Sequence, residues 1–297
     1  MSAPEGTGAG AWRGRPLGER TVSYEESDAI LYALAIGADA TDLDLVFEER
    51  LRVLPTFALT LAQWAPDALG ALGAFDIRTA VHGAQRLEVL APLPRAGKVA
   101  MRAYVGDVWD KGSAAVFDVV VVSDFSVATW SLFAPGRGGF GGERGPSAPA
   151  VPPGPTDHRT EVATAPNQAA LYRLLGDRHA MHIDPEAARA AGQPRPFLHG
   201  LCSLAAATLP LARYAGAHPA DLVRLEGRFA APVFPGDLLT AHTWEPTDAA
   251  ASPDLRFELH NGGRAAVSGG RAAYRTGRAA DTETADAPRQ VGASAEK

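Results

Sequence analysis

The apolar and polar positions of the chain fall into two similar groups of β-rich runs. The first group predicts strands over residues 86–89, 99–105 and 114–122, and the second over 222–229, 238–244, 255–259 and 265–274. Turn residues separate the long runs, with Lys111-Gly112 in the first group and Asn261-Gly262-Gly263 in the second, and Asn-Gly is a strong signal for a β-hairpin. Each group therefore predicts an antiparallel sheet.

Each group follows an apolar, helical stretch that begins after a proline, at residues 57–64 and 198–214. The second stretch carries small or apolar side chains on nearly every face, whereas a surface helix has a single apolar stripe. This helix must therefore be enclosed. The pattern predicts an α+β fold with two antiparallel sheets, each wrapped around a central helix, and joining the sheets edge to edge would leave fewer exposed strand edges.

Segments rich in Gly, Pro or Ala divide the chain. Residues 1–20 and 278–297 are predicted to be disordered tails. Residues 135–160 are predicted to be a linker, because five prolines between Pro146 and Pro155 exclude a helix or a central strand. The two halves, 21–134 and 161–277, share short motifs at an offset of 140 or 141 residues, such as Tyr32-Ala33-Leu34 and Tyr172-Arg173-Leu174. Matches at one offset favour a tandem duplication.

Length, charge and cysteine content narrow the class of protein. A chain of 297 residues that is 46% hydrophobic can bury one large core or two of about 140 residues each. The 28 basic and 34 acidic residues leave a net charge of −6, so no overall field favours nucleic acid or anionic lipid. The lone Cys202 cannot form an internal disulfide and no secretion leader is evident, which predicts a cytoplasmic protein. Residues 197–215 contain His199, Pro210 and Arg213, so we interpret them as a buried helix and not a membrane span.

The densest cluster of candidate chemistry lies between residues 177 and 200. Asp177 and His182 are five residues apart, a spacing at which a turn can direct a carboxylate and an imidazole at one small molecule. Such a pair can hold a water molecule and move its proton near neutral pH. The plain alternative makes Asp177 a helix cap and His182 a structural core histidine, and spacing alone favours that alternative.

Gly200 begins the apolar helix, where unpaired N–H groups can polarise a carbonyl oxygen. The alternative is that glycine serves only tight packing at the helix start. Asp184-Pro185 is typical of a helix start, so we disfavour a zinc site whose ligands would be His179, His182, Asp184 and His199. We therefore predict no metal site. Cys202 lies inside the apolar helix, where burial raises the pKa of a thiol, and it is not expected to be a nucleophile.

A glycine-rich segment precedes the linker. Residues 136–141 match the dinucleotide-binding pattern G-x-G-x-x-G, but the prolines that follow exclude the helix which that motif must begin. We reject a dinucleotide site. The glycine amides beside Arg137 could still receive phosphate groups, or the loop could serve only as the entrance to the linker.

Several motifs, in order, resemble the MaoC-like (R)-specific 2-enoyl-CoA hydratases, also called hydratase 2. In the second half these are Gly176-Asp177-Arg178-His179-Ala180-Met181-His182-Ile183-Asp184-Pro185 and Phe197-Leu198-His199-Gly200-Leu201-Cys202. The first half resembles the amino-terminal repeat of the two-repeat members through Leu54-Pro55-Thr56-Phe57, Val81-His82-Gly83, Asp110-Lys111-Gly112-Ser113 and Gly138-Gly139-Phe140-Gly141-Gly142. The likeness extends over residues 20–275.

The resemblance implies a double hotdog fold and reversible syn addition of water to a trans-2-enoyl-CoA, which gives the (3R)-3-hydroxyacyl-CoA, in fatty-acid or related metabolism. It implies that Asp177 and His182 activate the water and that the Gly200 amide binds the thioester oxygen. It implies no cofactor and a homodimer, with an N-terminal repeat that shapes the acyl pocket. We also expect contacts to the acyl-CoA from Arg137, Gly138, Gly139, Phe140 and His199.

One departure from the family bears on activity. This chain has His179-Ala180-Met181 where the family usually has Asn-Pro-Leu. The usual Asn helps to position water and substrate, so we include His179 among the catalytic candidates, as a group that could replace this hydrogen bond, shift the pKa of His182 or weaken activity. Two alternatives stay open, namely thioester hydrolysis on the same fold and an inactive acyl-CoA-binding subunit.

Overall fold

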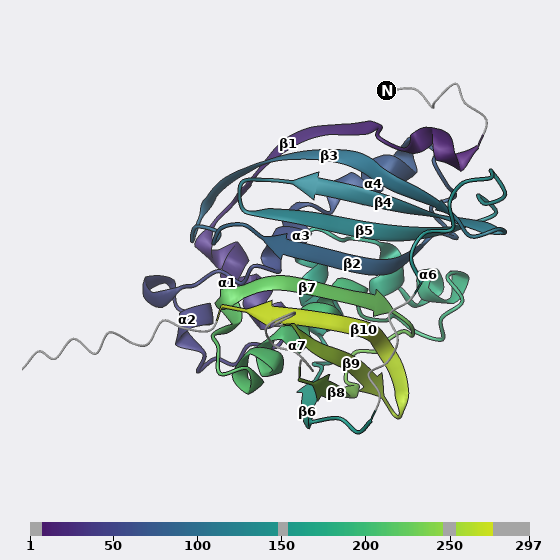
Figure 1. Cartoon of the computed structure of the whole chain (residues 1–297). Coiled ribbons are helices and arrows are strands. Elements are labelled where there is room, and N and C mark those ends of the chain that lie inside the picture. The colour runs from purple at the N-terminus through teal and green to yellow at the C-terminus, as the bar shows by residue number, and fades with distance from the viewer. Residues whose placement is uncertain (1–7, 148–153, 246–253, 276–297) are drawn as a thin grey trace, which may run out of the picture.

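The computed structural model describes residues 8–147, 154–245 and 254–275, and its strands form one antiparallel sheet (Figure 1). The strand order is β1-β3-β4-β5-β2-β7-β10-β9-β8-β6. The strands are β1 (Pro16–Tyr24), β2 (Val81–Val89), β3 (Gly97–Asp110), β4 (Ala114–Val122), β5 (Ser126–Pro135), β6 (His158–Ala163), β7 (Leu222–Phe229), β8 (Leu238–Trp244), β9 (Leu255–Asn261) and β10 (Arg264–Tyr274). The two predicted sheets are therefore continuous with each other.

The junction between the halves is the pairing of β2 with β7. Leu87 lies opposite Leu225 in this pairing, and both are fully buried. On the other face, Arg86 and Glu226 are opposite each other and form an ion pair of 3.2 Å. On either side of this junction the strands follow the same order, as a tandem duplication would produce. The predicted edge-to-edge joining is confirmed.

The helices lie against the concave side of the sheet in Figure 1. The predicted central helix of the second half is α7 (Gly200–Tyr214), and its residues 201–212 are all buried. The corresponding stretch of the first half is broken into α3 (Phe57–Leu61) and α4 (Trp64–Ala71), so the prediction of one helix over 57–64 is wrong there. The other helices are α1 (Glu26–Ala35), α2 (Leu43–Val46), α5 (Gln168–Tyr172) and α6 (Pro185–Ala190), with 3₁₀ turns η1 (Ala9–Trp12), η2 (Glu48–Arg50), η3 (Arg173–Leu175), η4 (Ala180–His182) and η5 (Pro219–Asp221).

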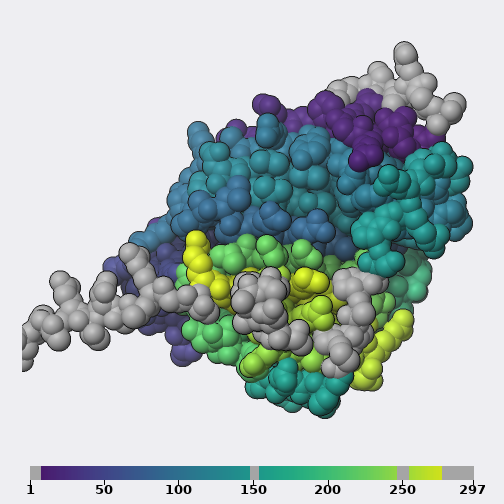
Figure 2. Space-filling model, viewed as in Figure 1, coloured from purple at the N-terminus to yellow at the C-terminus, as the bar shows by residue number. Residues whose placement is uncertain are grey.

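The predicted boundaries of the tail and of the linker are wrong at the two outer strands. Residues 9–20, expected in the tail, form η1 and most of β1, and Trp12 is buried. Figure 2 shows this purple segment packed along the first half of the molecule. Part of the expected linker likewise forms β6. Both are edge strands with one neighbour each, so they carry fewer apolar positions than central strands and their pattern is weak. Residues 278–297 lie outside the described residues.

None of the helices within the described ranges combines the length and the apolar character that a membrane crossing requires.

Candidate active site

The segment from Gly176 to Asp184 forms the candidate site together with the start of α7. A Cβ at Gly176 would lie 2.9 Å from the carbonyl oxygen of Thr60, so glycine is needed where this segment meets the first half. Asp184 caps α6, since its carboxylate accepts a hydrogen bond from the N–H of Glu186, and Pro185 occupies the first turn. The predicted helix start is confirmed, and the cap is Asp184 and not Asp177.

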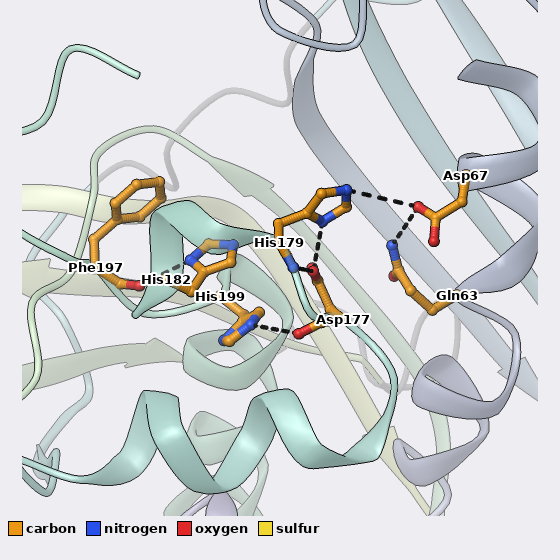
Figure 3. A network of polar contacts seen from close by, with 7 residues as sticks. All are labelled: Gln63, Asp67, Asp177, His179, His182, Phe197 and His199. Carbon is orange, nitrogen blue, oxygen red and sulfur yellow. Dashed lines mark hydrogen bonds and ion pairs between the residues drawn. The ribbon is translucent and has the colours of Figure 1, made fainter. Parts of the chain in front are cut away.

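Asp177, His182 and His199 converge, as the close-up in Figure 3 shows. One polar side-chain atom of each lies within 4.8 Å of the other two. The side chain of Asp177 is 17% exposed, whereas His182 and His199 are buried. At this spacing a single water molecule can contact all three groups, so the structure brings the two predicted catalytic side chains together.

The hydrogen bonds of the two buried histidines define their tautomers. Nδ1 of His182 lies 2.8 Å from the carbonyl oxygen of Phe197, to which it must donate, and this leaves Nε2 of neutral His182 as an acceptor. Nε2 of His199 donates to the backbone carbonyl of Asp177 at 3.1 Å. Burial lowers the pKa of His182, and burial together with the neighbouring His182 lowers the pKa of His199 to about 3. Both imidazoles are therefore neutral at neutral pH.

His179 is bonded directly to the carboxylate of Asp177. Its Nδ1 lies 2.5 Å from Oδ1 of Asp177, and its backbone N–H donates to the same oxygen. This hydrogen bond raises the pKa of His179 to about 9. Burial alone would raise the pKa of Asp177, but the hydrogen bond from His179 holds this pKa well below its ordinary value. The pair is therefore an imidazolium and a carboxylate at neutral pH.

Gly200 is the first residue of α7, beside the N-cap residue His199. Among the described residues, no oxygen accepts a hydrogen bond from its N–H, as expected in the first turn of a helix. A Cβ at this position would lie 2.9 Å from the ring of Phe229. Tight packing against Phe229 therefore explains why position 200 is a glycine. The N–H of Gly200, which has no partner among the described residues, can still donate to a carbonyl oxygen of a ligand.

The glycine-rich loop binds an anion of the protein itself. The carboxylate of Asp110 accepts hydrogen bonds from the N–H groups of Gly112, Gly139 and Gly141, at 2.8 to 2.9 Å. The prediction that this loop offers its amides to phosphate is therefore wrong for Gly139 and Gly141, because both amides are occupied.

Steric contacts account for two other residues of this loop. A Cβ at Gly138 would lie 2.3 Å from the carbonyl oxygen of Gly112, and the ring of Phe140 packs close to Gly10. Both residues therefore pack within the protein, and their contact with substrate stays a prediction. The side chain of Arg137 is partly buried, and its contact with substrate stays a prediction.

Cys202 is fully buried in α7, where its Sγ donates to the carbonyl of Ala35 and accepts from the side chain of Gln168. Burial raises the pKa of this thiol to about 12. These observations agree with the prediction that Cys202 is not a nucleophile.

Sequence reasoning missed the contribution of the first half to the site. Nε2 of His179 lies 4.0 Å from a carboxylate oxygen of Asp67 on α4, and the side chain of Gln63 donates to that oxygen at 3.3 Å (Figure 3). No pattern in the sequence links Asp67 to the motif around Asp177, because only the tertiary fold brings them together. The motif Val81-His82-Gly83 in the first half did include His82. Its ring lies edge-on to the ring of Phe229, with the ring centroids 4.7 Å apart.

Two family models match adjacent parts of the chain, the MFE-2 hydratase 2 N-terminal domain over residues 22–129 and the MaoC like domain over residues 148–252. A mouse protein named peroxisomal multifunctional enzyme type 2 is 38% identical over 78% of this chain, which spans 34% of that protein. The 3-hydroxyacyl-thioester dehydratase Y of Mycobacterium tuberculosis is 37% identical over 74% of this chain and 82% of its own length.

Solved structures of similar fold agree with these family matches. A MaoC-like dehydratase from Phytophthora capsici has a TM-score of 0.77 at 27% identity, over 86% of this chain and 94% of that chain. A Mycobacterium tuberculosis protein described as a double hotdog has a TM-score of 0.56 at 15% identity, over 86% of this chain and 93% of its own, which shows the fold alone. The predicted double hotdog fold is confirmed, and the chain belongs to the MaoC-like hydratase 2 family in its two-repeat form.

Proposed function

We propose that this protein is an (R)-specific enoyl-CoA hydratase, a hydro-lyase that reversibly adds water to trans-2-enoyl-CoA thioesters. One observation carries the proposal: an ionised carboxylate and a neutral imidazole meet beside the first amide of α7, and neither Nε2 of the imidazole nor this amide has a hydrogen-bond partner among the described residues. The names of the relatives point the same way, since one is a 3-hydroxyacyl-thioester dehydratase and an Arabidopsis relative is an enoyl-CoA hydratase 2.

The protonation states suggest how the two groups divide the work. His182 is the stronger base of the two, because the pKa of Asp177 is held low by His179. We assign to Nε2 of His182 the removal of a proton from water as the water oxygen bonds to C3 of the substrate. Asp177 orients the water and stabilises the imidazolium that forms.

The same proton completes the addition. Neither Asp177 nor His182 carries a spare proton at the start, so the proton taken from water is the one that His182 returns to C2. Hydroxyl and hydrogen thereby reach the double bond from the side that faces the pair, which gives syn addition. The N–H of Gly200 stabilises the negative charge that develops on the thioester oxygen meanwhile.

The proposal is tested by following the absorbance of the conjugated thioester with crotonyl-CoA and with a longer enoyl-CoA. Loss of this absorbance with formation of the (3R)-3-hydroxyacyl-CoA is the expected result. Release of free CoA thiol would instead identify a thioesterase. Binding of acyl-CoA without any turnover would identify the inactive binding subunit that the sequence left open.

The proposal also covers the oligomeric state, the cofactor requirement and the cellular location. We expect a homodimer without a cofactor, in which the N-terminal repeat shapes the acyl pocket, and light scattering of the purified protein measures the oligomeric state. The mouse relative is named as peroxisomal, and a cytoplasmic location stays a prediction for this chain.

A further inference from the structure

The segment from Gly176 to Asp184, here called the catalytic loop, contacts the N-terminal repeat at two points. Gly176 lies against the carbonyl oxygen of Thr60 at the end of α3, so closely that a Cβ there would be only 2.9 Å away. Three residues further on, His179 reaches α4, where the carboxylate of Asp67 is 4.0 Å from its Nε2. The repeat without the catalytic motif therefore contacts the loop on both sides of Asp177.

The second contact is a chain of polar groups that ends at the catalytic carboxylate (Figure 3). The side chain of Gln63 donates to Asp67, Asp67 faces Nε2 of His179, and Nδ1 of His179 donates to Asp177. Both nitrogens of the His179 ring thus face carboxylates. An imidazole between two carboxylates is held in the charged form and in one orientation, because both ring N–H groups then have an acidic partner.

The charges of the neighbouring side chains are compatible with this series of polar contacts from Gln63 to Asp177. Arg20 on β1 stacks on Trp64 and contributes positive charge near Asp67. Beside Asp177, the imidazoles of His182, His199 and His82 all have pKa values below their ordinary value and are neutral. Among the described residues, the carboxylates within 4.0 Å of the His179 ring are those of Asp67 and Asp177.

We propose that Asp67 is a positioning residue, which holds His179 from the N-terminal repeat and through it sets the orientation and charge of Asp177. Asp67 does not contact the reacting atoms in this assignment. The inference rests on the proposed function only for its effect on turnover, since the hold on His179 is a property of the folded protein. It assigns to the first repeat a part in the chemistry besides the acyl pocket.

The test compares Asp67→Asn with a matched control, Asp76→Asn. The first change removes the charge at nearly constant shape; the second removes the charge of an exposed carboxylate on the same repeat that pairs with Arg78 and not with the site. NMR titration of the His179 ring reads the contact directly. We expect its midpoint to fall by about 0.2 to 0.7 pH units in Asp67→Asn, the range for half-exposed ion pairs, and to stay unchanged in Asp76→Asn.

Turnover provides the second measurement. In Asp67→Asn we expect kcat to fall about 2- to 5-fold near pH 7.5 with an unchanged KM, because a weakened ground-state orientation affects the chemical step and not binding. The same change in a His179→Asn background should have no effect, since the group through which Asp67 acts is gone.

Three outcomes decide the matter. An unmoved His179 midpoint would overturn the inference, as would an equal loss of kcat in both backgrounds, which would indicate a merely structural role. If no variant and no parent protein hydrates enoyl-CoA, the proposed function fails, and the titration of His179 still decides whether Asp67 holds it.

Discussion

At the scale of single residues, the site differs from an ordinary carboxylate and histidine pair through its hydrogen bonds. Asp177 is kept ionised by His179, and His182 is kept neutral with Nδ1 committed to a backbone carbonyl. If these two groups perform acid–base chemistry, Asp177→Asn and His182→Gln should each lower kcat by about 100-fold or more. Steady-state hydration assays measure the loss. Rates within a few-fold of the parent in both variants would move the chemistry to other residues.

The pH dependence of stability follows from the raised pKa of His179. The imidazole ordinarily titrates near 6.5 and in the folded protein at about 9, so the folded state binds the proton more tightly than the unfolded state. The stabilisation is fully present below pH 6.5 and is lost as pH rises through 9. We expect the Tm of the parent to exceed that of His179→Asn most near pH 6, and the difference to vanish above pH 9. A difference independent of pH would contradict this assignment.

At the scale of elements, the glycine-rich loop is built around Asp110 at the end of β3. Hydrogen bonds from the amides of Gly139 and Gly112 lower the pKa of Asp110, so its folded pKa lies below its unfolded pKa. This stabilisation is present above the ordinary value of 3.8 and is lost as pH falls further. Asp110→Asn should therefore lower Tm at neutral pH and speed hydrogen exchange at Gly139 and Gly141, with a smaller effect in acid. Asp107→Asn, on the exposed side of the same strand, is the control and should leave that exchange unchanged.

The strands also show which parts of the fold could be predicted from the sequence. The expected ranges of β7 and β8 agree with the structure, because central strands bury apolar side chains in a clear pattern. The outer strands β1 and β6 were missed, since an edge strand has a weaker apolar pattern. The strand β5 was missed as well, although its inward side chains Ala128 and Trp130 alternate with Thr129 and Ser131.

At the scale of the whole molecule, part of the site could be predicted and part could not. The motif places Asp177, His182 and Gly200 within one segment of chain, where local spacing and resemblance suffice. Asp67 lies in the other repeat and reaches His179 only because the two sheets join and bring α4 to the catalytic loop. A contact of this kind depends on the packing of the repeats, to which a linear pattern gives no access.

The shared sheet predicts that the two repeats unfold together. Leu225 of β7 is fully buried opposite Leu87 of β2, so Leu225→Ala should lower the free energy of unfolding by about 2 to 5 kcal/mol. Three of the five tryptophans lie within residues 21–134, and a fourth, Trp12, is buried in η1 beside the same repeat. Their fluorescence therefore reports on the first repeat, while circular dichroism reports on both. Because β2 would lose β7, one of its two partner strands, when the second repeat unfolds, we expect both signals to shift to the same lower midpoint in urea. A tryptophan transition that keeps the parent midpoint while circular dichroism becomes biphasic would mean that the repeats are stable independently.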